Sequence, residues 1–256
     1  MADTNARNLI RLEWADLDKP VYRIYALDRF ETLLANKLDA VVTPTKWADP
    51  FEDFFLERTE VMDQVSGTTV PLRNLAGDWH GQCWSLNEDT DAMWRIYSPD
   101  PNTMPGVKVR TTVQKVFNNL KASGSTIPYL QFFVGKVDYA SETDIRQFMG
   151  KLTFSDIAMG GQGDRFADLL CIKRTAFEHE AEIRLLFQDI EPRRGSNGVF
   201  QFPLDANLVF EDVVLDPRLN DADAAALNPK LENAGCTLPI SRSPLYESPR
   251  FVIPLE

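Results

Sequence analysis

The sequence is poor in histidine and cysteine, the side chains that most often hold transition metals. Its 256 residues include two histidines, His80 and His179, and three widely separated cysteines. Because a structural zinc site needs several such ligands, usually in close pairs, we expect no metal of this kind. The odd number and wide spacing of the cysteines are typical of reduced, structural thiols.

Positive charge and long apolar runs are also scarce. The chain has 27 Lys and Arg residues against 38 Asp and Glu, a net charge of −11, so we expect no broad nucleic-acid-binding surface, although a local basic groove is compatible with this charge. No apolar run approaches the roughly 18 residues that a membrane span needs. The opening Met-Ala-Asp-Thr-Asn-Ala-Arg has no apolar signal segment. We therefore expect a soluble, cytoplasmic protein that does not enter membranes.

Hydrophobic residues, in contrast, make up 44% of the chain and include sixteen phenylalanines and five tryptophans, enough for a full core. Alternating apolar residues predict strands, as in 21–26 and 81–86, and an amphipathic pattern predicts a helix over 112–122. Strands and helices are interspersed without a regular strand–helix–strand rhythm. We therefore predict the α+β class, with a single domain over 20–256 and a mixed, largely antiparallel sheet flanked by helices. Residues 1–19 are polar, and we expect them to form an N-terminal arm.

Three glutamates stand at alternate positions, Glu178, Glu180 and Glu182, directly before the alternating apolar residues of 183–187. In a strand, residues two apart point the same way, so the pattern predicts three carboxylates on one face. Carboxylates this close raise one another's pKa and need a facing cation. The cation is a neighbouring side chain, a metal or a positively charged substrate. The simplest interpretation is a solvated strand end that is ion-paired with the basic residues of 173–184.

Four segments together resemble the bacterial domain-of-unknown-function family 2971, over roughly residues 20–216. They are Tyr22-Arg-Ile-Tyr25; Pro44-x-x-Trp-Ala-Asp-Pro-Phe-Glu52; Cys83-Trp-Ser85 with Met93-Trp-Arg-Ile-Tyr97; and Lys173, Phe177 and Glu180-x-Glu182-x-Arg184. The chain departs from the family's pattern at Ala48, at Phe177 and at Arg95-Ile96. Membership of this family implies no activity.

A second resemblance, to the ADP-ribosyltransferase superfamily, rests on the order of three elements. These are an Arg or His on the first strand, a Ser or Tyr after an aromatic residue on a middle strand, and Glu-x-Glu on a later strand. Here they are Arg23, Ser85 after Trp84, and Glu180-Ala-Glu182. The resemblance implies an ADP-ribosyltransferase-like fold and NAD as the substrate, with no metal.

The same resemblance implies a role for each residue. Glu182 would stabilise the positive charge that develops when the nicotinamide–ribose bond breaks, much as in glycoside hydrolysis. Glu180 would orient or deprotonate the acceptor nucleophile. Arg23 would hold the pyrophosphate or a ribose by charge-assisted hydrogen bonds. Ser85 would fix the nicotinamide side of NAD or the Glu182 carboxylate.

Aromatic residues would supply a flat wall for the nicotinamide ring, and the candidates are Trp94 and Tyr97, with Trp84 as a third. Ordinary core packing is the alternative for each of them. The first functional hypothesis is therefore an NAD-dependent ADP-ribosyltransferase, such as a toxin or phage-defence effector. Its acceptor would be a protein or a nucleic acid, and the sequence does not specify which.

Two other functions stay open. A Mg²⁺-dependent nuclease or phosphohydrolase would use Asp49, Glu180 and Glu182, because Mg²⁺ prefers oxygen ligands. Asp49 also fits the N-cap of a helix that begins at Pro50. A non-enzymatic sensor or interaction domain would use Glu-x-Glu-x-Arg as an ion-paired structural strand. The glycine-rich segment 160–163 lacks the lysine and the Ser or Thr of a P-loop, and we expect a loop there.

Overall fold

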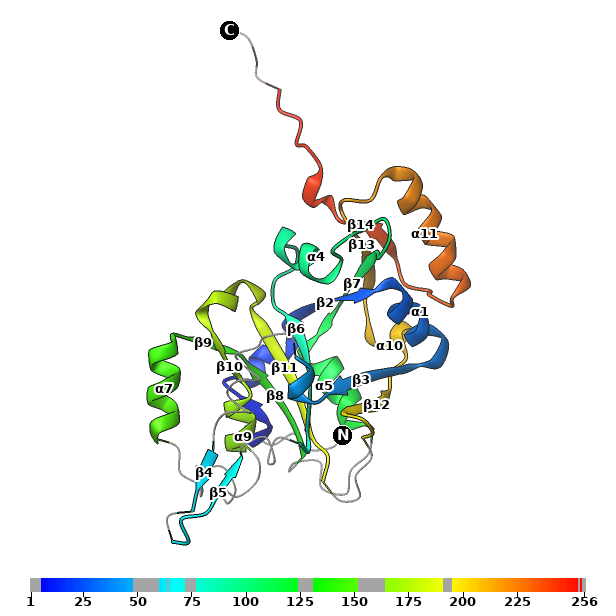
Figure 1. Ribbon diagram of the computed structural model, residues 1–256. Helices are drawn as coiled ribbons and strands as arrows, with labels where there is room; N and C mark the ends of the chain where they lie inside the picture. The colour runs from blue at the N-terminus through cyan, green and yellow to red at the C-terminus, as the bar shows by residue number, and fades with distance from the viewer. Residues whose placement is uncertain are drawn as a thin grey trace.

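A computed structural model of the chain describes residues 6–47, 60–63, 65–71, 77–123, 131–151, 164–190, 195–252 and 254. In these residues one large sheet is surrounded by helices, and the expected α+β class is confirmed (Figure 1). The turn expected around Asp49 and the glycine-rich segment 160–163 lie outside the described residues. Within the described part of the chain, no helix has both the length and the apolar character that crossing a membrane requires.

The main sheet has ten strands in the described residues. Eight of them follow one another across the sheet: β1 (Leu9–Ile10), β8 (Phe132–Lys136), β11 (Glu182–Gln188), β6 (Trp79–Ser85), β2 (Pro20–Ala26), β7 (Gly106–Thr112), β13 (Asp212–Leu215) and β14 (Ile240–Arg242). The remaining two are β3 (Leu38–Val42), which pairs with β6, and β12 (Val199–Pro203), which pairs with β3. The pairs β1–β8 and β13–β14 at the two edges are parallel and the others antiparallel, so the mixed, largely antiparallel sheet is confirmed.

Two small sheets lie outside this one. In the first, β4 (Glu60–Met62) pairs with β5 (Thr69–Pro71). In the second, β9 (Asp138–Ala140) runs parallel to β10 (Ile172–Arg174). The second sheet matters for function, because β10 comes just before the acidic motif and β9 follows directly after β8.

Helices surround the sheet: α1 (Leu27–Asn36), α4 (Asp91–Tyr97), α5 (Val113–Lys121), α7 (Glu142–Lys151), α9 (Asp164–Leu169), α10 (Ala206–Val209) and α11 (Asp221–Asn233). Short 3₁₀ helices are η1 (Ala6–Asn8), η2 (Trp14–Asp18), η3 (Pro44–Lys46), η4 (Thr175–Glu180) and η5 (Pro244–Tyr246). Side chains cap α4, α5 and α11, because Thr90, Thr112 and Asn220 accept hydrogen bonds from backbone N–H groups of the first turns of these helices.

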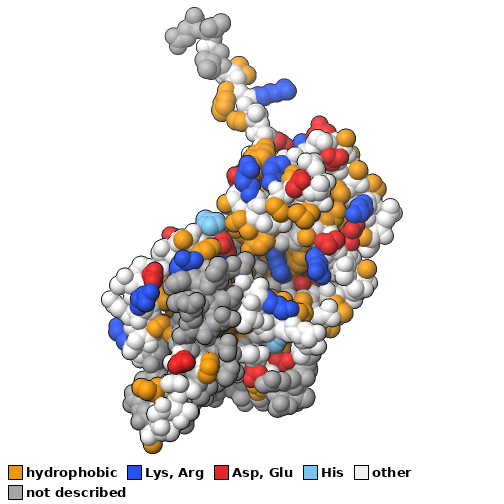
Figure 2. Space-filling view, in the orientation of Figure 1, with side chains coloured by type: hydrophobic (Ala, Val, Ile, Leu, Met, Phe, Trp, Pro, Cys, Tyr) orange, Lys and Arg blue, Asp and Glu red, His pale blue; other side chains and the backbone are white. Residues whose placement is uncertain are grey.

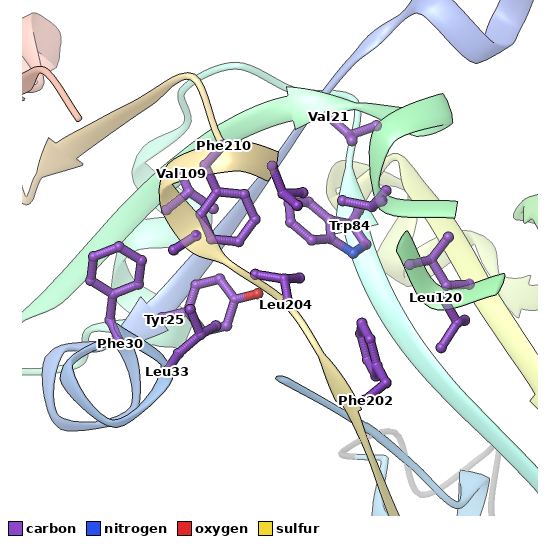
Figure 3. Close-up of a cluster of buried hydrophobic side chains, with 14 of the residues drawn as sticks. Val21, Tyr25, Phe30, Leu33, Trp84, Val109, Leu120, Phe202, Leu204 and Phe210 are labelled. Atoms are coloured by element: carbon purple, nitrogen blue, oxygen red, sulfur yellow. The ribbon is translucent and has the colours of Figure 1, made fainter. Parts of the chain in front are cut away.

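The core lies on both faces of the central strands, as the alternation along β8 and β11 requires. Ile183, Leu185 and Phe187 of β11 pack into the larger cluster, which also holds residues of α1 and α5. Figure 3 shows part of this cluster around Phe30 and Trp84. Leu186 points the other way, into a second cluster with Trp79, Phe133 and Phe166 of α9. Strand β11 is thus buried on both faces, which fixes its pairing register and, with it, the position of its first residue, Glu182.

The segment expected to form an N-terminal arm carries η1, β1 and η2. Leu9 of β1 is the register partner of Val134 in β8. The side-chain amide of the buried Asn8 donates to the carbonyl oxygen of Phe132 at 2.6 Å. Residues 8–10 are therefore tied to the edge of the main sheet.

Candidate active site

The acidic motif contains a turn that the sequence analysis did not predict. Residues 175–180 form the 3₁₀ helix η4, Ala181 adopts a left-handed conformation with φ of 44°, and β11 begins only at Glu182. The expectation of three carboxylates on one strand face is therefore wrong: Glu178 is exposed on η4, whereas Glu180 and Glu182 are buried. The reason is topological. Because β10 pairs with β9 while β11 pairs with β6 and β8, the chain has to turn between β10 and β11.

The register of the central strands brings the ADP-ribosyltransferase-like residues together. Glu182 is the register partner of Ser85 on β6, and Ser85 is the partner of Tyr22 on β2. Arg23 follows Tyr22 on that strand. Three positions far apart in the sequence therefore lie on three adjacent strands, β2, β6 and β11.

Four charged side chains form a buried cluster at the start of β11, which we call the acid–base cluster: Lys173, Glu180, Glu182 and Arg184. The ammonium of Lys173 donates to Glu180 Oε2 at 3.0 Å and to Glu182 Oε1 at 2.5 Å. The other oxygen of Glu182, Oε2, accepts from Arg184 Nε at 2.8 Å. All four residues are at least 93% buried, so these contacts replace water that the charges have lost.

The two carboxyl groups of the cluster differ in proton affinity. Burial raises the pKa of Glu180 to about 7, and the neighbouring Glu182 carboxylate, which accepts a hydrogen bond from protonated Glu180, adds to the rise. Burial acts in the same direction on Glu182, but Arg184, the hydrogen bond from Glu180 and Lys173 outweigh it and hold the pKa of Glu182 far below its usual range. Near neutral pH, one carboxylate is therefore permanently charged and its neighbour gains and loses a proton.

The cluster opens into a pocket of about 510 Å³. Five of the six residues singled out from the sequence line it: Arg23, Ser85, Tyr97, Glu180 and Glu182. Other side chains at its wall are Tyr22, Lys46, Trp47, Gln82, Cys83, Trp84, Met93, Ile96, Lys173, Phe177 and His179. The pocket therefore combines several aromatic rings with charges of both signs.

Arg23 lies at the pocket wall on a supporting network. Its guanidinium is 4.7 Å from the centre of the Tyr25 ring and 6.0 Å from that of Trp84, and its Nη1 is 3.8 Å from Asp39 Oδ2. Gln82 belongs to the same network, because its amide N–H donates to Asp39 at 2.8 Å and its amide oxygen accepts from the Trp84 indole N–H at 2.8 Å. This network holds the guanidinium in one place.

The described hydrogen bonds of Ser85 are both to backbone groups. Its hydroxyl donates to the backbone carbonyl of Glu180 at 2.7 Å and accepts from the N–H of Asn87 at 3.0 Å. Of the two partners expected for Ser85, the Glu182 carboxylate is bonded to Lys173 and Arg184 instead, and contact with the nicotinamide side of NAD stays a prediction. Ser85 thus ties strand β6 to the η4 turn and fixes the position of Glu180.

The two aromatic candidates of α4 have different surroundings. Tyr97, at the end of the helix, is 42% exposed and lines the pocket. Trp94 is fully buried, and its indole N–H donates to Asp89 Oδ1 at 2.6 Å. The structure does not bring Trp94 to the large pocket. Trp94 lines a neighbouring cavity of about 20 Å³, which has room for about one water molecule.

Three pocket residues that the sequence analysis had not assigned to the site are Lys46, Trp47 and Tyr22. Trp47 lies against β6 because Gly81 has no side chain there: a Cβ on Gly81 would be 2.6 Å from the Trp47 ring. The Trp47 ring also lies 4.4 Å from the guanidinium carbon of Arg184. Tyr22 and Trp47 belong to segments that carry the resemblance to family 2971, and this was the available signal for them.

One face of the molecule is of mixed character. On the face seen in Figure 2, the described lysine and arginine side chains are scattered among acidic and hydrophobic ones. This distribution accompanies the net charge of −11. The described pocket wall carries three cationic side chains, Arg23, Lys46 and Lys173, beside the carboxyl groups of Glu180 and Glu182.

No protein-family model and no curated protein sequence matches the chain. The solved structures similar to it include three of DarT from Thermus sp. 2.9, in complex with ADP-ribosylated ssDNA, NAD+ and carba-NAD+. Their TM-scores are 0.40, 0.38 and 0.37, at 12%, 12% and 13% identity, and the matches cover 88% of this chain and 94%, 96% and 95% of those chains. A likeness at these TM-scores is too weak to assign an activity, and the membership of family 2971 stays a prediction.

Proposed function

We propose that the pocket binds NAD and that the protein transfers ADP-ribose from NAD to a macromolecular acceptor. The observation that supports this most is that Arg23, Glu180 and Glu182, chosen from the sequence order alone, line one pocket together with Tyr97. The volume of about 510 Å³ falls within the roughly 300–1,000 Å³ of small-molecule sites. Aromatic walls suit the flat nicotinamide and adenine rings.

The split between the two carboxyl groups suits the two steps of this reaction. The bond between nicotinamide and C1′ of the ribose breaks, and nicotinamide leaves as a neutral molecule with the bonding electrons. The charged Glu182 stabilises the positive charge that remains on the ribose. Glu180, whose pKa is raised to about 7, accepts the proton of the acceptor group as that group bonds to C1′.

Arg23 is suited to hold the diphosphate of NAD. Its described polar contacts, to Tyr25 and Asp39, both involve Nη1. A guanidinium carries five N–H donors, so the others remain for an anion. Its position over two aromatic rings keeps the planar group oriented, which lowers the entropy cost of binding. An effector role as a toxin or in phage defence rests on the resemblance alone.

The contacts of Glu182 weigh against the Mg²⁺-dependent alternative. Both of its oxygens already accept hydrogen bonds, from Lys173 and Arg184, so direct coordination of Mg²⁺ would have to replace or crowd these contacts. In the part of the chain that the structure describes, no three His, Cys, Asp or Glu side chains are grouped so that they could hold a metal. The non-enzymatic alternative, an ion-paired structural strand, predicts no release of nicotinamide from NAD, so the release assay separates it from the proposal.

The test is release of nicotinamide from NAD by the purified protein, followed by mass spectrometry with and without lysate, RNA and DNA. Glu180→Gln keeps the size of the side chain and removes the base, and we expect it to slow release by about 100-fold or more. Glu178→Gln is the matched control, because Glu178 is exposed on the same turn, and we expect wild-type rates.

Two results would contradict the proposal. One is the absence of nicotinamide release together with the absence of a thermal shift on adding NAD. The other is cleavage of RNA or DNA that requires Mg²⁺ and disappears in Glu180→Gln, which would establish the nuclease alternative instead.

A further inference from the structure

Strands β9 and β10 form a small two-stranded sheet beside the acid–base cluster. Lys173 of β10 and Tyr139 of β9 are register partners in this sheet. Both reach Glu182: the Lys173 ammonium donates to its carboxylate at 2.5 Å, and the Tyr139 hydroxyl accepts from its backbone N–H at 2.8 Å. The small sheet therefore holds the first residue of β11 at its backbone and at its side chain.

Lys173 reaches the second carboxylate as well. Its ammonium is 3.0 Å from Glu180 Oε2, and it lies 4.8 Å from the centre of the Phe177 ring on η4. Lys173 is 93% buried, so these contacts are little weakened by water. One ammonium thus joins the η4 turn to β11, across the left-handed Ala181.

We infer that Lys173 is a positioning residue, whose ammonium bridges Glu180 and Glu182 and fixes both carboxyl groups at the pocket wall. Its meaning for catalysis rests on the proposed function, in which the two carboxyl groups act on the ribose and on the acceptor. Lys173 acts through them: with its charge in place, Glu182 stays ionised and Glu180 can lose its proton near neutral pH.

Other titratable and charged groups also face the pair. They are Arg184 on β11, Tyr139 on β9, Tyr97 on α4, Cys83 on β6 and His179 on η4. Arg184 bonds to the Glu182 oxygen that faces away from Lys173. The two tyrosines have pKa values raised by burial and stay neutral. Lys173 is the group whose described contacts reach both carboxylates.

The experiment is a pH titration of Glu180 in the full chain, followed by the ¹³C NMR signal of its carboxyl carbon, with Glu180→Gln to assign that signal. We expect Lys173→Met to move the midpoint upward by about 1–2 pH units, because a facing positive charge is lost. Lys173→Arg keeps the charge and should stay close to the wild type. Lys136→Met removes an exposed charge from β8, the neighbouring strand, and should leave the midpoint unchanged.

Near-UV circular dichroism first establishes that each variant is folded. Lys173→Gln, which keeps a hydrogen-bonding group and has no charge, replaces Lys173→Met if that variant has lost its tertiary signal. A midpoint in Lys173→Met or Lys173→Gln that equals the wild-type value would overturn the inference. So would an equal shift in Lys136→Met.

Turnover of NAD supplies the second readout. We expect Lys173→Met to lower kcat by about tenfold or more and to leave KM for NAD within about twofold, with partial rescue in Lys173→Arg. A change confined to KM would overturn the positioning role. If the wild-type protein shows no turnover while the titration midpoint still moves, the bridge stands and the proposed reaction fails.

Discussion

Two buried charge clusters in this protein differ in whether one of their members titrates near neutral pH beside a pocket. In the first, Asp216 and Arg218 form a pair in which guanidinium nitrogens meet the two carboxylate oxygens at 2.9 and 2.6 Å. The same guanidinium donates to the backbone carbonyls of Trp94 and Ser98 at the end of α4. The second is the acid–base cluster, where two glutamates share Lys173 and Arg184.

In the first cluster, the two charged side chains pair with each other. It has one charge of each sign, Asp216 is fully buried, and Arg218 Nη2 also donates to the backbone carbonyls of Trp94 and Ser98. The second leaves a carboxyl group, Glu180, that titrates near neutral pH and faces a pocket. A buried ion pair is therefore structural when its contacts are complete, and it is a candidate for chemistry when one member keeps an exchangeable proton beside open space.

The largest effect is expected from Glu182→Gln, which removes the permanent charge of the acid–base cluster. Lys173 and Arg184 lose a buried partner, so we expect the free energy of unfolding to fall by about 3–5 kcal/mol. Nicotinamide release should fall by about 100-fold or more. Urea denaturation and the release assay measure the two effects. Release within about threefold of the wild type, in folded protein, would remove Glu182 from the mechanism.

Arg218→Met breaks the Asp216–Arg218 ion pair and should lower stability without changing the titration of Glu180. The buried Asp216 loses its partner, and we expect a loss of about 3–5 kcal/mol in the free energy of unfolding. In the protein that remains folded, the Glu180 titration midpoint should equal the wild-type value. Urea denaturation and the NMR titration check this. A shifted midpoint would show that the two clusters are coupled through α4.

Arg23→Met tests the ligand-binding wall of the pocket and should act mainly on affinity. A charge-assisted hydrogen bond contributes roughly 1.5–3 kcal/mol, so we expect the Kd for NAD to rise about 10- to 100-fold. Isothermal titration calorimetry measures the change. Arg23→Lys keeps the charge without the planar fork, so its Kd for NAD should lie between those of the wild type and Arg23→Met. Unchanged affinity in Arg23→Met would place the diphosphate elsewhere.

A pH dependence of stability is expected from Glu180. Its folded-state pKa of about 7 lies above the ordinary value of 4.5, so the folded protein holds an extra proton between these pH values. Stability should therefore fall as pH rises from about 4.5 to about 7, and this slope should be absent in Glu180→Gln. Thermal denaturation of both proteins across this range gives the answer. Equal slopes would mean that Glu180 ionises normally.

Much of the fold was predictable, because it depends on local patterns. The apolar residues of 21–26 and 81–86 predicted β2 and β6. The resemblance placed Arg23, Ser85 and Glu182 on a first, a middle and a later strand, and the sheet topology shows that these strands are neighbours. The η4 turn was not predictable, since Glu178, Glu180 and Glu182 fit an extended strand until the different pairing of β10 and β11 is known.

The features of the site that the sequence did not predict depend on contacts between distant segments. Trp94 and Tyr97 stand on one short helix, and the sequence does not say which of them faces the pocket. The rotation of α4 decides this, and it is fixed by Asp89, Arg218 and the C-terminal Tyr246, which bonds to the first residue of the helix. Ion pairing between Lys173 and the acidic motif was expected from the sequence, but the bridge from Lys173 to both Glu180 and Glu182 depends on the η4 turn and was not.

A crystal structure of the protein with a non-cleavable NAD analogue tests the central claim most directly. The account predicts the analogue in the large pocket, with its diphosphate hydrogen-bonded to Arg23 and C1′ of the nicotinamide ribose within about 4 Å of the Glu182 carboxylate. An empty pocket at saturating analogue, or an analogue bound away from Arg23 and Glu182, would contradict it.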